Sequence, residues 1–198
     1  MVVNDPCVSP NPSPSAEEPT PRSAVEPIQD REDSVDAMLR QWAEHRPGVD
    51  VSSSEVVARL LRAARLAEEL FEARLRRQPG RTITNVGDFD LLQTLRRAAP
   101  GHALTPGQLM RHLVVSSAGL SGRLNRLERD GWIVRTASPD DRRRSLVRLT
   151  VQGREEFDRR LEDHLAAERE LLSVLDARER AVVVDALRKL LFLLEASE

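Results

Sequence analysis

Cysteine and aromatic side chains are almost absent from this sequence. Its single cysteine, Cys7, has no partner for an intramolecular disulfide, and its four histidines are scattered rather than set at metal-ligand spacing. Aromatic residues make up 3% of the chain, so aliphatic side chains have to fill a hydrophobic core. We therefore expect a protein of the reducing cytoplasm that holds no metal and no cofactor.

Long hydrophobic runs and catalytic motifs are missing as well. The most apolar run, residues 181–194, is shorter than the roughly 20 residues that span a bilayer. It is also interrupted by Asp185, Arg188 and Lys189. No Gly-x-Ser-x-Gly sequence, phosphate-binding glycine pattern or signal peptide occurs. These absences argue against a membrane protein and against an enzyme.

The charges are unevenly distributed, although the formal net charge is only −2. Residues 1–36 contain eight acidic residues against two arginines, a local charge of −6. Residues 102–149 contain nine arginines against four acidic residues, a local charge of +5. A basic patch inside a near-neutral protein is typical of a nucleic-acid-binding protein.

The stretch from Ser116 to Gly131 predicts a helix with one polar, cationic face. Leu120, Leu124 and Leu127 recur at the spacing of one helical stripe, and the two end residues are suited to cap the helix. At about 100° per residue, the other side chains point away from that stripe. They are Ala118, Ser121, Gly122, Asn125, Arg126 and Arg129. Small and amide side chains suit base edges in a major groove, and arginines suit phosphates.

Two short apolar runs after this helix, residues 132–135 and 146–149, predict a β-hairpin. Pro139 and Asp140 are suited to turn its tip. Arg142, Arg143 and Arg144 follow, and arginine at an exposed loop suits a narrow minor groove, where the negative potential is strongest. A solvated run of charge is the alternative. The position directly after the polar-faced helix favours DNA binding.

The chain divides into four predicted parts. Residues 1–33 hold seven of the twelve prolines and are expected to form a disordered acidic tail. Residues 34–80 are expected to form two helices on the dimerisation and ligand-pocket side, the second capped by the serines at 52–54. Residues 81–149 are expected to form a winged helix-turn-helix, and residues 150–198 C-terminal dimerisation helices.

Two further helices are predicted before the polar-faced one. Asn85 opens the first as a capping-box variant with Asp88, and Thr105 with Pro106 starts a brief second helix that ends at His112. Tightly joined helices followed by a hairpin make a winged helix-turn-helix. The predicted fold class is therefore mainly α with a small β-hairpin, a winged helix-turn-helix DNA-binding domain plus a helical dimerisation region.

The C-terminal part is predicted to be a subunit interface. Thr150 and Asp176 are suited to cap its two helices. The last helix is apolar almost all round through Val182, Val183, Val184, Leu187, Leu190, Leu191, Phe192, Leu193 and Leu194. A terminal helix of a small domain cannot bury that much surface alone, so we expect a second copy of the chain to cover it.

These residues resemble the multiple-antibiotic-resistance regulator (MarR) family of bacterial transcription factors. The wing sequence DRRRSLVRLT, residues 141–150, matches the family signature, and LSGRLNRLERDGWIVR, residues 120–135, fits the helix that precedes it. The resemblance covers roughly residues 34–195. It implies a homodimer that reads a near-palindromic double-stranded operator, often as a repressor. Its implied DNA-binding residues are Ser116, Ser117, Ala118, Ser121, Asn125, Arg126, Arg129, Asp141, Arg142, Arg143 and Arg144, with Asp141 orienting a wing arginine.

A narrower resemblance is to the urate-responsive, PecS-like branch of that family. It rests on QWAEHRPGVD at 41–50, NVGDFDLLQTLRR at 85–97 and LTPGQL at 104–109. The branch's ligand-binding residues map onto Trp42, Asp90, Arg123 and Arg135. Gly122 and Ala118 depart from the branch, which commonly has asparagine and glycine there. The implied ligand is a small aromatic anion such as urate, with another phenolic or acidic ligand as the alternative.

The residues themselves support part of this site. Arg123 lies about 60° from the leucine stripe and faces the flank of the domain, where it needs an acidic partner or an anion. An Asp90 bridge to Arg97 and simple packing of Trp42 are the structural alternatives.

The sequence offers less support for two other functions. A peroxide sensor is disfavoured because Cys7 has no basic cluster near it. A helical protein-interaction scaffold would explain the long helices but not the arginines of the hairpin.

Overall fold

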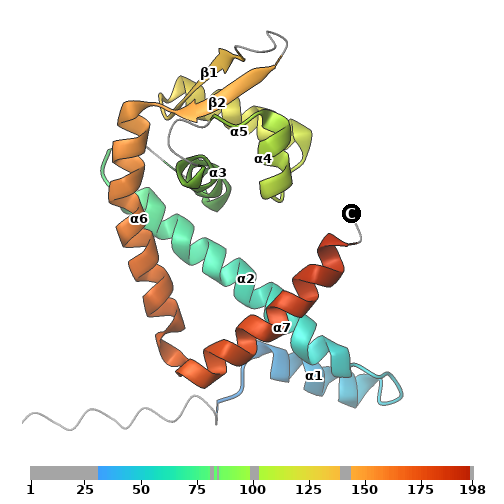
Figure 1. Cartoon of the computed structure of the whole chain (residues 1–198). Coiled ribbons are helices and arrows are strands. Elements are labelled where there is room, and N and C mark those ends of the chain that lie inside the picture. The colour runs from blue at the N-terminus through green and yellow to red at the C-terminus, as the bar shows by residue number, and fades with distance from the viewer. Residues whose placement is uncertain (1–30, 81–82, 84, 99–102, 139–143, 197–198) are drawn as a thin grey trace, which may run out of the picture. The chain divides into compact units, whose positions relative to one another are not determined.

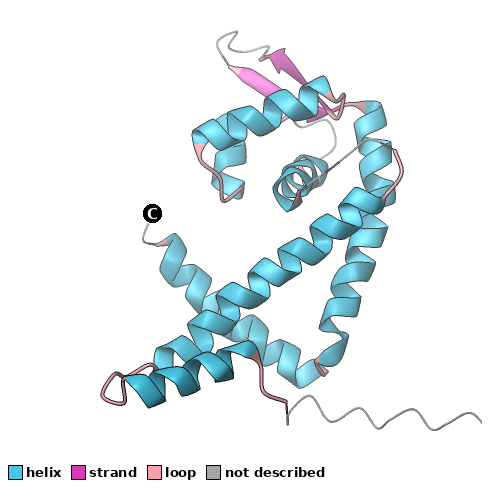
Figure 2. Cartoon of the chain, turned by 180° about the vertical axis from the view of Figure 1, so that it is seen from behind, coloured by secondary structure: helices cyan, strands magenta, loops and turns pink. Residues whose placement is uncertain are grey.

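The structure is a computed structural model that describes residues 31–80, 83, 85–98, 103–138 and 144–196. Its elements in chain order are α1 Ser34–His45, α2 Ser52–Arg77, α3 Val86–Arg97, α4 Pro106–His112, α5 Ser117–Arg129, β1 Ile133–Ala137, β2 Ser145–Leu149, α6 Val151–Leu171, the 3₁₀ turn η2 Leu172–Val174, and α7 Ala177–Glu195 (Figure 1). The hairpin of β1 and β2 is the one regular sheet in the described part of the chain (Figure 2). The predicted fold class is thereby confirmed.

The chain separates into two compact units whose boundary falls between Glu55 and Val56. In the first unit, the Asp33 carboxylate caps α1 by accepting the N–H groups of Val35 and Asp36 at 2.7 and 3.0 Å. Before α2, the Asp50 carboxylate accepts the N–H of Ser52 at 2.9 Å. The serines at 52–54, the predicted cap of this helix, lie in its first turn.

The second unit has an aliphatic core around α3 and α5. Leu120, Leu124 and Leu127 are all buried, as their spacing predicted. Leu91 and Leu92 of α3 pack in the same cluster. The remaining members are Leu75, Ile83, Phe89, Leu95, Leu109, Leu113, Trp132, Ile133, Val147 and Phe157. The core therefore holds the polar-faced helix by its apolar stripe and leaves its other side uncovered.

The hairpin is antiparallel, with Ile133 opposite Leu149 and Ala137 opposite Ser145. Its first strand begins one residue later than predicted, at Ile133, and the preceding Trp132 is fully buried in the core. Leu104, before α4, adds a short third pairing: its N–H donates to the Val147 carbonyl at 3.0 Å and its carbonyl accepts the Val147 N–H at 2.8 Å. This pairing, which the sequence did not reveal, fixes the hairpin to the start of α4.

Capping interactions join the elements around the hairpin. Gly131 ends α5 in a left-handed conformation, with φ of 75°, which favours glycine. Thr150 starts α6, because its hydroxyl accepts the Gly153 N–H at 2.8 Å and donates to the Gly131 carbonyl at 2.8 Å. The Thr150 cap is thus confirmed. It ties the end of the hairpin to the helix that precedes it.

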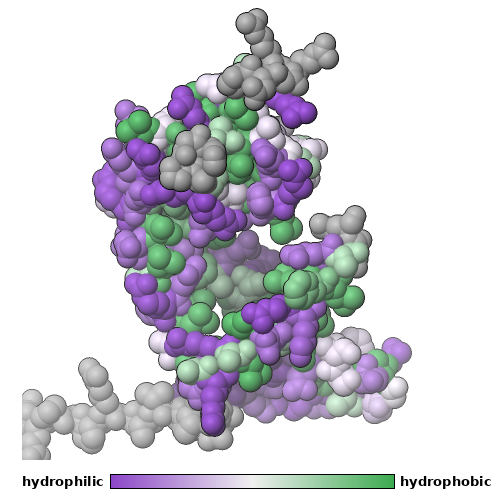
Figure 3. Space-filling view, in the orientation of Figure 1, coloured by the Kyte–Doolittle hydropathy of each residue, from purple (hydrophilic) through white to green (hydrophobic). Residues whose placement is uncertain are grey.

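The apolar side chains of α7 are uncovered. Asp176 caps this helix as predicted, accepting the N–H of Glu179 at 2.8 Å. No side chain of α7 is buried, and Phe192 and Leu193 are 67% and 66% exposed. Hydrophobic surface of this helix is visible in the space-filling view (Figure 3). Even so, none of the described helices is long and apolar enough to cross a membrane.

Candidate nucleic-acid interface

Helix α5 presents an exposed face of small and polar side chains. Ser117, Ala118, Ser121 and Asn125 are exposed along it, one turn after another. Arg129 ends this face with a 73% exposed side chain that also donates to Asp130 at 3.2 Å. The Ser116 hydroxyl accepts the Gly119 N–H at 3.2 Å, so Ser116 caps the helix. The exposed face combines small, hydroxyl, amide and cationic groups, which suits base edges and phosphates.

The predicted orientation of Arg126 was wrong. Its guanidinium turns back to α3, where Nε and Nη2 donate to Asp88 Oδ2 at 3.0 and 2.7 Å. Asp88 is 2% exposed and also accepts from the Asn85 amide nitrogen at 3.1 Å. A buried carboxylate needs such partners, so Arg126 holds α5 against the start of α3 instead of pointing to the bases.

Arg135, a predicted ligand-binding residue, is instead engaged by two side chains of α5. Its Nε donates to Glu128 Oε2 at 2.8 Å, and its Nη2 donates to Asn125 Oδ1 at 2.8 Å. Its backbone N–H donates to Glu128 Oε1 at 3.1 Å. The side-chain hydrogen bond from Arg135 holds the pKa of Glu128 below its ordinary value. Arg135 therefore fixes β1 to the side of α5, beside the Asn125 amide group.

Arg123 is half-buried and lies against the first turn of α3. No acidic side chain of the described residues is within ion-pair distance of its guanidinium. The guanidinium occupies the space above Gly87 in which any other residue would have its β-carbon. Asp90, half-buried on α3, does not pair with Arg97, whose Nη2 donates to Thr94 Oγ1 at 3.1 Å. The structural alternative for Asp90, a bridge to Arg97, is therefore not formed.

The predicted ligand-binding residues are divided between the two units of the chain. Asp90, Arg123 and Arg135 belong to the second unit, whereas Trp42 belongs to the first unit and is 42% exposed. Among the wing residues, Asp141, Arg142 and Arg143 lie outside the described residues. Arg144 and Arg148, just before and within β2, are exposed.

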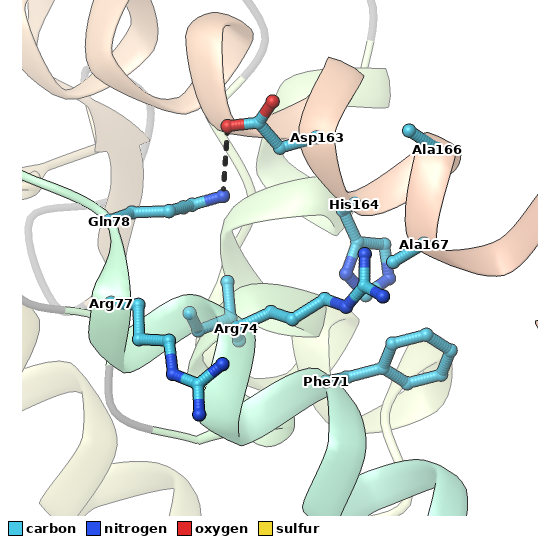
Figure 4. A pocket seen from close by; sticks show the side chains of 9 residues that line it. Phe71, Arg74, Arg77, Gln78, Asp163, His164, Ala166 and Ala167 are labelled. Atoms are coloured by element: carbon cyan, nitrogen blue, oxygen red, sulfur yellow. Dashed lines mark hydrogen bonds between the residues drawn. The ribbon is translucent and has the colours of Figure 1, made fainter. Parts of the chain in front are cut away.

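A separate cavity of about 390 Å³ lies between the C-terminal part of α2 and the middle of α6 (Figure 4). Arg74, Arg77 and His164 line it together with Phe71. The His164 ring lies 4.9 Å from the ring of Phe71 and 4.1 Å from that of Phe89. Burial lowers the pKa of His164 and so favours its neutral form. None of the predicted ligand-binding residues lines this cavity.

Asp88 is the functional residue that sequence reasoning missed. The sequence pattern predicts that Asp88 is a local cap, yet it shares a helical stripe with the buried Leu91, Leu92 and Leu95. A carboxylate on a buried stripe requires a cation, and that signal could have identified Arg126 as its partner. In the described part of the chain, no cluster of three acidic, histidine or cysteine side chains could hold a metal ion.

The arrangement of α4, α5 and the hairpin defines a winged helix-turn-helix protein, in which α5 is the recognition helix. A family model described as the MarR family matches residues 81–144. The transcriptional regulator PecS of Dickeya dadantii is 31% identical over 146 residues, which cover 74% of this chain and 86% of PecS. The chain belongs to the MarR family of transcriptional regulators, within the predicted PecS-like branch.

Two solved structures extend the comparison to DNA complexes. FabT of Streptococcus pneumoniae in complex with DNA is 25% identical, with a TM-score of 0.63 over 74% of this chain and 99% of FabT. A mutant MarR of E. coli complexed with operator DNA is 27% identical, with a TM-score of 0.59 over 72% of this chain and 99% of that protein. This chain is thus similar to regulators that have been solved in complex with DNA.

Proposed function

We propose that this protein is a homodimeric repressor that a small aromatic anion, such as urate, releases from a near-palindromic operator. The exposed face of α5 carries this proposal. Ser121 and Asn125 offer hydroxyl and amide groups at the centre of that face, and Arg129 offers a cation at its end. Two such helices, one from each subunit, would enter successive major grooves about 34–36 Å apart.

The uncovered surface of α7 supports the homodimer. Nine apolar side chains between Val182 and Leu194 are exposed on all sides of the helix. Exposed apolar surface on this scale marks an interaction site, and a second copy of the chain has the same helix to offer. A Phe192→Glu substitution in this surface should shift the sedimentation coefficient toward the monomer and weaken operator binding.

The surroundings of Arg123 support an anionic ligand. Among the described residues its half-buried guanidinium has no acidic partner, which makes it a favourable place for a carboxylate or for the urate anion. It lies on the flank of the recognition helix, so a ligand bound there would act directly on the position of α5. The family resemblance adds Asp90 and Trp42 to the proposed ligand-binding residues, and a phenolic or other acidic ligand would suit the same chemistry.

Selection of DNA fragments from the source genome tests the DNA-binding part. The purified protein should retain specific fragments, with an affinity that falls steeply as the salt concentration rises. Binding without sequence preference, or with no salt dependence, would instead favour the helical protein-interaction scaffold.

Titration of urate against the operator complex tests the ligand part. Urate should lower the operator affinity of the wild-type protein. Arg123→Ala should keep most of that affinity but lose the response. An unchanged affinity at saturating urate would exclude urate as the ligand, and the same titration with salicylate and other aromatic acids would then test the alternative.

A further inference from the structure

Two consecutive residues of α3, Gly87 and Asp88, are contacted by two arginine side chains of the recognition helix. Asp88 accepts the guanidinium of Arg126, and Gly87 lies directly beneath the guanidinium of Arg123. The two arginines are three residues apart on α5, so they lie on neighbouring turns of one flank. One of these cations is neutralised by a buried carboxylate, whereas the other has no acidic partner in the described part of the chain.

The position of the Arg123 guanidinium depends on residue 87 being a glycine, which has no β-carbon. A β-carbon at position 87 would overlap the Cζ, Nη1 and Nη2 atoms of Arg123 together. All three belong to the far end of a flexible side chain, so an alanine there would displace the guanidinium without forcing the backbone to move. Substitution of Gly87 is therefore a way to move the Arg123 charge while every residue of α5 stays the same.

We propose that Gly87 is a positioning residue for the effector response, because it seats the Arg123 guanidinium at the first turn of α3. This inference rests on the proposed function, in which an anion at Arg123 weakens operator binding. Gly87 directly precedes Asp88, whose ion pair with Arg126 holds the recognition helix. An anion drawn to Arg123 therefore acts at the point where α5 is fixed to α3.

The chain offers a matched control. Gly107 is the second residue of α4, just as Gly87 is the second residue of α3. A β-carbon on Gly107 would meet nothing within 4 Å. Gly107→Ala therefore reports the helix preference of alanine over glycine alone, and Gly87→Ala reports that preference together with the displacement of Arg123.

The first measurement needs no ligand. The melting temperature is measured for the wild type, Gly87→Ala, Arg123→Ala and the double variant, with Gly107→Ala as the control. Alanine at position 87 should raise the melting temperature in the Arg123→Ala background, as Gly107→Ala does in the wild type, and should raise it less or lower it when Arg123 is present. An equal shift in both backgrounds would overturn the contact between Gly87 and Arg123.

The second measurement is the urate response of the operator complex. Gly87→Ala should bind the operator within twofold of the wild type yet require at least tenfold more urate for half-maximal release, whereas Gly107→Ala should need the wild-type urate concentration. A wild-type urate response in Gly87→Ala, or a large loss of its operator affinity, would overturn the positioning role of Gly87 and leave the proposed effector response standing. A wild-type protein that responds to no tested anion would overturn the proposed effector response as well, and the melting temperatures would still decide the contact.

Discussion

The guanidinium of Arg126 lies across the carboxylate of Asp88, with Arg126 Nη2 2.7 Å and Nε 3.0 Å from Asp88 Oδ2. The carboxylate is buried and the arginine side chain is 38% exposed. This pair joins the start of α3 to the second half of the recognition helix. Together with the buried leucine stripe of α5, this pair fixes the orientation of the recognition helix.

Arg126→Ala should therefore destabilise the protein. The substitution leaves the Asp88 carboxylate buried with only the Asn85 side chain and no cation, and breaking a buried pair in this way costs about 3 kcal/mol. Urea denaturation should show this loss in the free energy of unfolding. Arg129→Ala, on the exposed face of the same helix, should change that energy by less than about 0.5 kcal/mol. Equal effects of the two substitutions would contradict the clamping role of Arg126.

Arg126 shows which parts of the site could be predicted from the sequence and which could not. The spacing of Leu120, Leu124 and Leu127 fixes the buried stripe of α5, so the helix, its caps and its exposed serines follow from the sequence. The same spacing places the Cβ of Arg126 about 120° from the stripe, which suggested an outward side chain. An arginine has a long flexible stem, however, and its guanidinium can end far from the direction of its Cβ.

Contacts between distant segments were beyond the reach of sequence patterns. The Leu104 pairing with Val147 joins two single residues, so it leaves no periodic signal. The engagement of Arg135 by Glu128 depends on how β1 returns along α5, which local spacing does not determine. The space above Gly87 is likewise set by the approach of α5 to α3.

Stability should depend on pH through Glu128. The hydrogen bond from Arg135 lowers the folded-state pKa of Glu128 below its ordinary value of 4.5. The stabilisation is therefore present above pH 4.5 and is lost as the pH falls through the lower folded-state pKa. Glu128→Gln should have a lower free energy of unfolding than the wild type near neutral pH. This difference should shrink as the pH falls below 4.5 and through the folded-state pKa of Glu128. A difference that is constant from pH 7 to about pH 3 would contradict the ion pair.

Ser121, Asn125 and Arg129 should differ in what they contribute to DNA binding. Ser121→Ala and Asn125→Ala remove groups suited to base edges, so each should lower operator affinity by about 1–3 kcal/mol and leave non-specific affinity nearly unchanged. Arg129→Ala removes a cation suited to phosphate, so it should weaken both and reduce the salt slope by about one. Fluorescence anisotropy with operator and scrambled duplexes at several salt concentrations separates these cases.

Arg65→Ala is the control for these measurements, because its exposed side chain pairs with Glu69 on α2 and has no place in the interface. Its affinities should match those of the wild type. Loss of non-specific binding by Asn125→Ala would instead assign Asn125 to the DNA backbone.

Gly153→Ala should destabilise the junction between the hairpin and α6. A β-carbon on Gly153 would overlap the backbone carbonyl oxygen of Trp132 and lie 2.9 Å from Thr150 Oγ1. The Trp132 carbonyl accepts the Thr150 N–H at 3.0 Å, and the indole of the same residue is fully buried. The carbonyl therefore cannot move without disturbing the core. Overpacking of this kind costs about 1–3 kcal/mol, which outweighs the better helix propensity of alanine.

The melting temperature and the urea midpoint of Gly153→Ala are measured and compared with those of Gly107→Ala and the wild type. Both substitutions place alanine in a helix, but only position 153 meets backbone atoms, so the first variant should unfold earlier than the wild type and the second should not. Equal stability of the two variants would mean that α6 can move away from the hairpin. The recognition helix would then be held by the Asp88–Arg126 pair and the apolar core, with no contribution from this junction.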